Sequence, residues 1–251
     1  MNALRTIAIL WLRQVKRNIR SRARIIGSLG QPLLFLVALG FGFGPVYAQA
    51  GRGAYLEFLG PGVIAMSVLF TAMFSGIDLI WDRQFGFLKE TLVAPVPRTA
   101  IMIGRTLGGA TVAVFQGVLV TALTLLVGFR PASWLLVPLV LIPMALIAIL
   151  FTALGTAIAI RMRDMQAFPL IVNFLIMPLF FLSGALFPVD GIPRALAVVV
   201  RANPLAYGVD AMRGLLTHSA SFGIGWDLLL LSVLAVVCVG IGSVLFRGME
   251  G

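Results

Sequence analysis

Six stretches of the chain, each 19 residues or longer, contain no Asp, Glu, Lys or Arg. They cover residues 25–51, 58–77, 106–129, 131–160, 165–189 and 228–246. A helix of about 20 apolar residues is long enough to cross the hydrocarbon core of a bilayer. Because lipid offers no hydrogen-bond partners, a spanning segment must satisfy its own backbone, which favours helices. The pattern predicts an all-α integral membrane protein with six spans.

The composition supports this prediction and excludes other classes of protein. Hydrophobic residues make up 60% of the 251 residues, charged residues 11%, and the mean hydropathy is +1.06. Soluble domains are about one quarter charged. The one cysteine, Cys238, excludes a disulfide framework. We therefore expect a single transmembrane domain over residues 1–251, with spans at about 25–46, 58–81, 104–128, 134–160, 166–187 and 226–246.

Two segments outside the spans are also expected to be helical. Apolar residues recur at helical spacing within residues 1–24, with basic residues between them, which is typical of an amphipathic helix lying along the inner leaflet. The apolar members are Leu4, Ile7, Ala8, Trp11, Val15 and Ile19. The second segment, Leu196 to Val200, is bounded by Arg194 and Arg201 and is too short to cross. We expect it to be re-entrant or interfacial.

The net charge of +10 is explained by where the basic residues fall relative to the spans. One side holds 14 of them: Arg5, Arg13, Lys16, Arg17, Arg20, Arg22, Arg24, Arg83, Lys89, Arg98, Arg105, Arg161, Arg163 and Arg247. The other side holds five: Arg52, Arg130, Arg194, Arg201 and Arg213. Basic residues collect on the cytoplasmic side of membrane proteins, beside anionic lipid. We predict that both termini are cytoplasmic, and that membrane lipid rather than nucleic acid is the partner of these charges.

The sequence offers little material for catalysis or for ion coupling. His218 stands alone, Cys238 lies inside the last apolar stretch, and no His, Cys and carboxylate cluster has metal-ligand spacing. Asp78 and Asp227 lie at span ends, from which both can reach an interface. Polar side chains expected at depth, such as Gln31, Gln116 and Asn173, fit helix–helix hydrogen bonding as well as substrate contact. A membrane enzyme and an ion-coupled transporter are therefore both disfavoured.

The chain also lacks a nucleotide-binding loop of the P-loop type. That motif requires Gly immediately before its Lys. The only lysines are Lys16 and Lys89, which follow Val15 and Leu88. We expect no catalytic residue, metal or cofactor on this chain. If ATP drives it, another polypeptide must bind the ATP.

The connection after the second span mixes charged and large apolar residues, a pattern that a solvent-exposed loop would not need. It reads Asp-Arg-Gln-Phe-Gly-Phe-Leu-Lys-Glu-Thr-Leu-Val-Ala-Pro-Val-Pro-Arg from Asp82 to Arg98. Charges alternate with Phe and Leu, which predicts a short amphipathic helix that stops near Pro95. Its periodicity fits a passive interfacial helix and a partner-docking helix equally well.

The segment after the fifth span is punctuated by Pro188, Pro193 and Pro204. It contains Phe-Pro-Val-Asp-Gly-Ile-Pro from Phe187 and Asn-Pro-Leu-Ala-Tyr-Gly-Val-Asp-Ala-Met-Arg-Gly from Asn203. Asn203 before Pro204 predicts a helix start, since Asn caps the first turn and Pro fits its first position. Asp210 and Arg213 fall on one face of that helix and could pair.

These segments resemble the membrane subunits of ABC-2 type exporters, the permease family that includes daunorubicin-resistance, Nod-factor, O-antigen and teichoic-acid export permeases. The resemblance covers essentially the whole chain. In the inner pattern Asp82, Arg83, Gly86, Leu88, Lys89, Glu90, Pro95 and Arg98 fit, whereas Gln84 stands where the family often has Glu. In the outer pattern Phe187, Pro188, Asn203, Pro204, Tyr207, Asp210, Arg213 and Gly214 fit.

The resemblance implies a fold, partners and roles. It implies the ABC-2, or type V exporter, fold in a bacterial-type cytoplasmic membrane. Residues 82–98, including Phe85, become a coupling segment that meets a separate ATPase subunit, which binds ATP and Mg²⁺. Residues 188–214 become short re-entrant helices that close the outer mouth, and a second copy of the chain completes the pathway.

The substrate remains open between two classes at this point. The inner pattern is closest to the drug-exporter branch, which favours an amphiphilic or hydrophobic substrate, a drug-like molecule or a lipid. A polysaccharide or lipid-linked glycan exporter of the same family is the alternative. An ion-coupled secondary transporter is a third hypothesis, and dependence on an ion gradient would favour it.

Overall fold

The computed structural model describes residues 3–49, 54–93, 95–162, 164–189 and 192–248, and every regular element in these ranges is a helix. Arg52 and Arg163 of the charge count, and the side chain of Lys89, lie outside this description. The helices are α1 (Ala3–Arg20), α2 (Arg22–Gln49), α3 (Tyr55–Phe74), α4 (Ile77–Gln84), α5 (Phe87–Val93), α6 (Arg98–Val127), the 3₁₀ helix η1 (Trp134–Val140), α7 (Leu141–Arg161), α8 (Ala167–Phe181), α9 (Arg194–Ala202), α10 (Pro204–Thr217) and α11 (Ile224–Arg247).

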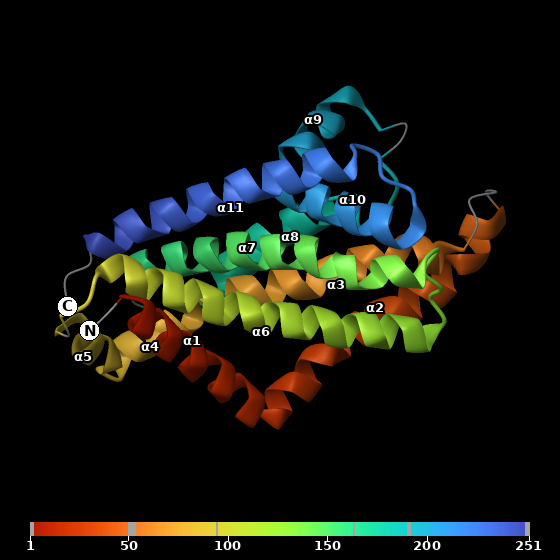
Figure 1. Cartoon of the computed structure of the whole chain (residues 1–251). Coiled ribbons are helices and arrows are strands. Elements are labelled where there is room, and N and C mark those ends of the chain that lie inside the picture. Colours follow the sequence, from red (N-terminus) through yellow and green to blue (C-terminus); the bar gives the residue numbers. More distant parts are fainter. Residues whose placement is uncertain (1–2, 50–53, 94, 163, 190–191, 249–251) are drawn as a thin grey trace.

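Five segments in the described part of the chain are long and apolar enough to cross a membrane. They are Arg22–Gln49, Tyr55–Gln84, Arg98–Val127, Trp134–Arg161 and Ile224–Arg247. The second combines α3 with α4, and the fourth combines η1 with α7. These five agree with five of the six spans that the sequence predicts. The helices α3, α6, α7 and α11 run along the long axis of the molecule (Figure 1).

The remaining predicted span, 166–187, was expected to be a full-length helix, and that expectation is wrong. Its helix α8 has 15 residues, or about 22 Å of length at 1.5 Å per residue. Pro178 interrupts the backbone bonding near the end of α8, and Gly184 turns the chain with a φ of 74°. The end of the segment nevertheless reaches the start of α3, where the Tyr55 hydroxyl donates to the carbonyl of Leu186 at 2.8 Å.

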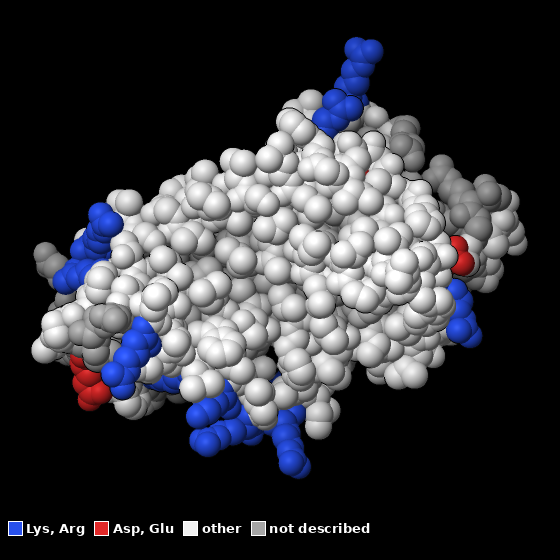
Figure 2. Space-filling view, viewed as in Figure 1, with Lys and Arg blue, Asp and Glu red and all other residues white. Residues whose placement is uncertain are grey.

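The start of α6 and the end of α11 meet at one end of the bundle. Arg98, at the start of α6, donates to the carbonyl of Arg247, at the end of α11, at 2.6 Å. Figure 1 shows α1, α4 and α5 at this end and α9 and α10 toward the other. We call the first the terminal end and the second the opposite end. Across the broad middle of the face seen in Figure 2 no charged side chain is visible.

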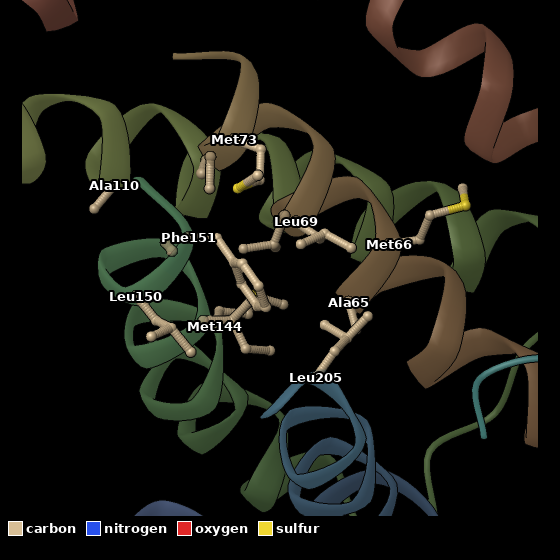
Figure 3. Close-up of a cluster of buried hydrophobic side chains, with 14 of the residues drawn as sticks. Ala65, Met66, Leu69, Met73, Ala110, Met144, Leu150, Phe151 and Leu205 are labelled. Atoms are coloured by element: carbon tan, nitrogen blue, oxygen red, sulfur yellow. The ribbon is translucent and has the colours of Figure 1, made fainter. Parts of the chain in front are cut away.

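The core is centred on α3. Most of its residues are buried, including Ala65, Leu69 and Met73, and Figure 3 shows them against Met144 and Phe151 of α7. The backbones of α3 and α7 touch where α7 has Gly155, since a Cβ there would lie 2.4 Å from the carbonyl oxygen of Met73. Small residues permit this approach between membrane helices, where packing replaces the hydrophobic effect.

The helix α1 forms over the predicted residues. Leu4 and Ile19 of its apolar stripe are 80% and 59% exposed, as expected of apolar side chains that face lipid. The helix also packs on α6, where Gly104 admits the backbone of Ile7. Arg13 and Arg17, expected among the lipid headgroups, turn toward the carboxylates of α4.

Candidate functional site

The segment from Asp82 to Arg98 is not the single helix expected from its periodicity. The first residues, Asp82 to Gln84, belong to the end of α4. Gly86 then has a φ of 81°, a left-handed conformation that suits Gly, and the chain restarts as α5 at Phe87. The helix ends at Val93, two residues before Pro95. Asp82 and α5 are therefore separate parts of the terminal end.

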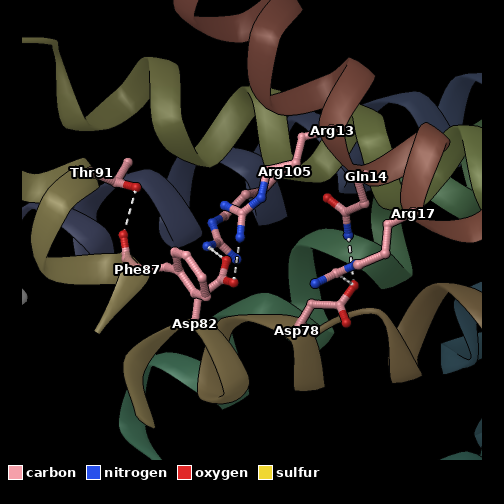
Figure 4. A network of polar contacts seen from close by, with 8 residues as sticks. All are labelled: Arg13, Gln14, Arg17, Asp78, Asp82, Phe87, Thr91 and Arg105. Carbon is pink, nitrogen blue, oxygen red and sulfur yellow. Dashed lines mark hydrogen bonds and ion pairs between the residues drawn. The ribbon is translucent and has the colours of Figure 1, made fainter. Parts of the chain in front are cut away.

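Asp82 is the centre of a buried ion network. Its carboxylate accepts from Arg13 of α1 at 2.8 Å and from Arg105 of α6 (Figure 4). The side chains of Asp82 and Arg105 are only 7% and 8% exposed. A buried carboxylate needs such partners, because burial removes its water. The network ties α4 to α1 and α6.

A second carboxylate lies one turn earlier on α4. Asp78 pairs with Arg17 and accepts from the Gln14 side chain at 3.2 Å. Its side chain is 14% exposed. The expectation that Asp78 reaches an interface is thus replaced by pairing within the protein, which fixes α1 against α4 at two successive turns.

Two arginines extend these links to the last helices by binding carbonyl oxygens. Arg83 donates to Met162 at 2.7 Å and to Ile160 at 3.1 Å, at the end of α7. Arg98 donates to the end of α11. The segment that contains α4 and α5 is therefore linked to α1, α6, α7 and, through Arg98, α11.

The outward side of this segment combines apolar and polar groups. Phe85 and Phe87 are 63% and 50% exposed, and Gln84, Glu90 and Pro95 are also exposed. Leu88 is buried at 3% exposure and anchors α5 to the core. The guanidinium of Arg13 lies 5.4 Å from the centre of the Phe87 ring. Exposed aromatic rings beside charge are typical of surfaces that bind another protein.

At the opposite end, the predicted start of α10 is confirmed. The Asn203 side chain accepts from the Leu205 amide at 3.0 Å, and Pro204 occupies the first turn. The same side chain donates to the Leu179 carbonyl of α8 at 2.6 Å. The Tyr207 hydroxyl donates to the carbonyl of Arg201 at 2.6 Å, closing the corner between α9 and α10. Phe187 and Pro188 lie half-buried in the connection that leaves α8.

The charged residues of α10 each bind a different neighbouring segment. Asp210 accepts from the amides of Ser221 and Phe222 at 2.8 to 2.9 Å. Arg213 donates to the carbonyls of Phe58 at 3.3 Å and Gly184 at 3.0 Å. The spacing of Asp210 and Arg213 predicted that they could pair with each other. In the structure these hydrogen bonds go instead to the backbone of neighbouring segments.

Two further residues of α10 and α11 complete this corner. Gly214 of α10 allows the start of α11 to pack closely against it, since a Cβ at position 214 would lie 2.8 Å from the Ile224 side chain. Asp227, expected at an interface, is fully buried, and its carboxylate has no hydrogen-bond donor within the described residues. It lies beside Asp210.

Sequence reasoning missed Arg105, Arg13 and Arg17 as partners of α4. Their basic charge was visible, but it was assigned to the membrane surface. The signal that was available is the pair of carboxylates Asp78 and Asp82, one helical turn apart among an excess of basic residues. Two acidic groups at a span end require cations, but only the fold says which.

Comparison with known proteins agrees with the features described above. Residues 5–217 match the ABC-2 type transporter family. Nodulation protein J of Rhizobium leguminosarum bv. viciae is 29% identical over 210 residues, covering 81% of this chain and 80% of that protein. Nodulation protein J of Rhizobium meliloti (strain 1021) is 28% identical over 227 residues, covering 90% and 86%. The inner membrane transport permease YadH of Escherichia coli (strain K12) is 28% identical over 207 residues, covering 81% and 80%.

The family match includes both segments that the sequence singled out, α4–α5 and α9–α10. Such permeases are the membrane component of a transporter and have no ATPase domain of their own, which implies a partner ATPase. The chain belongs to the ABC-2 type transporter family, as a permease subunit.

Proposed function

We propose that this chain is half of an ATP-driven exporter of the cytoplasmic membrane. Two copies form the pathway, and a separate ATPase subunit, carrying ATP and Mg²⁺, docks on each. The observation that carries the proposal is the exposed face of Phe85, Phe87 and Glu90, which stands next to the buried network of Asp82.

The docking surface is formed by Gln84, Phe85, Phe87 and Glu90. Its two exposed Phe rings supply apolar area, and Glu90 supplies a charge for pairing across the interface. Gln84 lacks the charge that relatives often place there, so the interface relies more on Glu90. Leu88 holds α5 to the rest of the protein from the opposite side.

Movement of the ATPase subunits would pass through α4. This helix continues the span that begins with α3, so a push on α5 acts on the central helix of the core. The links of Asp82 to Arg105 and of Arg83 to the end of α7 carry the same displacement to α6 and α7. Packed helices that shift as semi-rigid bodies are a common form of such transitions.

The opposite end serves as the outer gate in this proposal. Both termini are cytoplasmic, and α8 with residues 182–186 completes a sixth crossing. Two observations support this: Leu186 bonds to the first residue of α3, and α1 and the end of α11 lie at one end of the bundle (Figure 1). The corner of α9 and α10 then lies outside, and its hydrogen bonds close the mouth. We assign an amphiphilic or hydrophobic substrate to the pathway.

The test is purification of the tagged chain from its native membrane in mild detergent, with its soluble partners identified by mass spectrometry. We expect an ATPase subunit in equal amount. Reversing Glu90 to Lys should release it and stop transport while the permease remains in the membrane. Glu57→Lys is the matched control, because Glu57 is exposed at the opposite end of α3.

Retention of the ATPase and normal transport in the Glu90→Lys variant would remove Glu90 from the docking surface. Loss of the ATPase in both variants would indicate a general charge effect. A homo-oligomer with no ATPase, found again after crosslinking in intact membranes, would overturn the proposed function.

A further inference from the structure

A cavity of about 750 Å³ lies between α1, α2, α6 and the span formed by α3 and α4. This volume is within the range of roughly 300–1,000 Å³ found for small-molecule sites. The ion network of Asp78 and Asp82 forms part of its wall, and Figure 4 shows Arg17 and Arg13 beside these carboxylates. Phe85 and Phe87 of the docking surface lie at the edge of this lining, and the docking and gating roles proposed above use no other part of the cavity.

One end of the cavity carries an excess of positive charge. Arg13, Arg17 and Arg24 line it against Asp78 and Asp82. Arg105 adds another cation, since it shares the Asp82 carboxylate with Arg13. Four guanidinium groups thus face two carboxylates. Within the described residues Arg24 forms no ion pair, so its charge is available to a ligand.

The other end is apolar and lies deeper in the bundle. Met66, Phe70 and Phe74 of α3 line it, with Pro32 of α2 and Val112 of α6. Met66 precedes Asp82 by 16 residues, which is about 24 Å along the span. The cavity therefore runs from a charged end near the terminal surface to an apolar end near the middle of the protein.

Polar side chains also line the cavity, among them Ser28, Gln31, Ser67, Thr71 and Gln116, and three of these form hydrogen bonds within the protein. Ser28 of α2 donates to Gln116 of α6 at 2.9 Å, and Ser67 donates to the Ile64 carbonyl at 2.8 Å. Beside them, an alkyl or aromatic group would replace water against Met and Phe.

The surroundings indicate how a ligand arrives. Leu12 and Ile19 of α1 are 42% and 59% exposed, and Ile26 of α2 is 71% exposed. Large apolar residues on the outer sides of the two helices that flank the cavity place lipid beside it. A ligand with an apolar tail can therefore enter from the membrane.

We propose that this cavity binds an amphiphile with an anionic headgroup, the headgroup at Arg24 and Arg17 and the tail against Met66 and Phe70. The cavity proposal names the substrate class of the exporter, and in that respect the proposal rests on the proposed function. Binding itself requires only this chain. A carboxylate or phosphate headgroup forms charge-assisted bonds to guanidinium groups. A cationic amphiphile meets unpaired positive charge instead.

The experiment measures binding by quenching of Trp81, which lines the cavity. The purified chain, with Trp11, Trp134 and Trp226 changed to Phe, is titrated in neutral detergent with dodecyl phosphate or dodecyltrimethylammonium, each brominated on its chain. We expect the phosphate to bind roughly tenfold more tightly, and Arg24→Gln to remove most of that difference. Arg22→Gln is the matched control, because Arg22 is exposed, carries the same charge and does not line the cavity.

Equal binding of the two amphiphiles, or equal loss in the Arg22 and Arg24 variants, would overturn the site. A second readout separates substrate from resident lipid. In vesicles with the ATPase partner, a transported amphiphile raises ATP hydrolysis in the parent and not in Arg24→Gln. Selective binding without that stimulation identifies a structural lipid site and overturns the substrate assignment. Failure of binding while the ATPase still copurifies overturns the cavity proposal and leaves the proposed function standing.

Discussion

The carboxylates at the two ends of the bundle have different kinds of partner. At the terminal end, Asp78 and Asp82 pair with arginine side chains from α1 and α6. At the opposite end, Asp210 binds the backbone amides of Ser221 and Phe222. Arginines bind backbone carbonyls at both ends, as Arg83 does at the terminal end and Arg213 at the opposite end. Ion pairs between side chains can exchange partners when helices shift. Bonds to a fixed backbone amide or carbonyl hold one geometry.

This difference suits the two roles proposed for the ends. The terminal end must pass on movement from an ATPase, and its Asp82 carboxylate already shares two guanidinium groups. The opposite end must stay closed until that movement arrives, and its corner is held by the Asn203, Tyr207, Asp210 and Arg213 contacts. Three variants test the contrast.

The largest effect is expected for Asp82→Ala at the terminal end. It leaves Arg105 buried without its carboxylate, and breaking a buried pair in this way costs about 3–5 kcal/mol. The thermal unfolding midpoint of the purified chain should fall sharply. The double variant Asp82→Leu with Arg105→Met, which removes both charges, should recover much of the loss. Equal destabilisation in single and double variants would mean that the pair is not what stabilises this site.

An intermediate effect is expected for Asp210→Ala at the opposite end. The amides of Ser221 and Phe222 lose their acceptor, at a cost of about 1–3 kcal/mol. The same thermal unfolding measurement detects it. Asp227→Asn is the control, because the neighbouring Asp227 carboxylate receives no donor within the described residues and its neutral amide should be tolerated. A larger loss from Asp227→Asn than from Asp210→Ala would contradict this account of the corner.

The smallest effect is expected for Arg17→Gln. The Arg17 side chain is 36% exposed, and Asp78 keeps the hydrogen bond from Gln14 when Arg17 is replaced. Salt should reduce the difference from the parent further, since dissolved ions can reach and screen this partly exposed pair. Unfolding midpoints at low and high salt measure both points. A loss as large as that of Asp82→Ala, unchanged by salt, would show that the two carboxylates of α4 are equivalent.

Several features could be read from the sequence because they depend on local chemistry. The charge-free stretches gave five of the spans, and Asn203 followed by Pro204 gave the start of α10. The break between α4 and α5 was missed because the left-handed Gly86 interrupts a periodic pattern. The short α8 was missed because hydropathy counts apolar residues without seeing where Pro178 and Gly184 end the helix.

The sequence alone determined that this chain is a helical membrane protein, without a nucleotide loop and with its basic residues unevenly distributed. These properties follow from composition and spacing, which set the solvent in which each segment is stable. Only the tertiary structure decided which charges meet. Arg13 and Arg105 are 92 residues apart in the chain and share one carboxylate, because a buried charge takes its partner from whichever helix packs beside it.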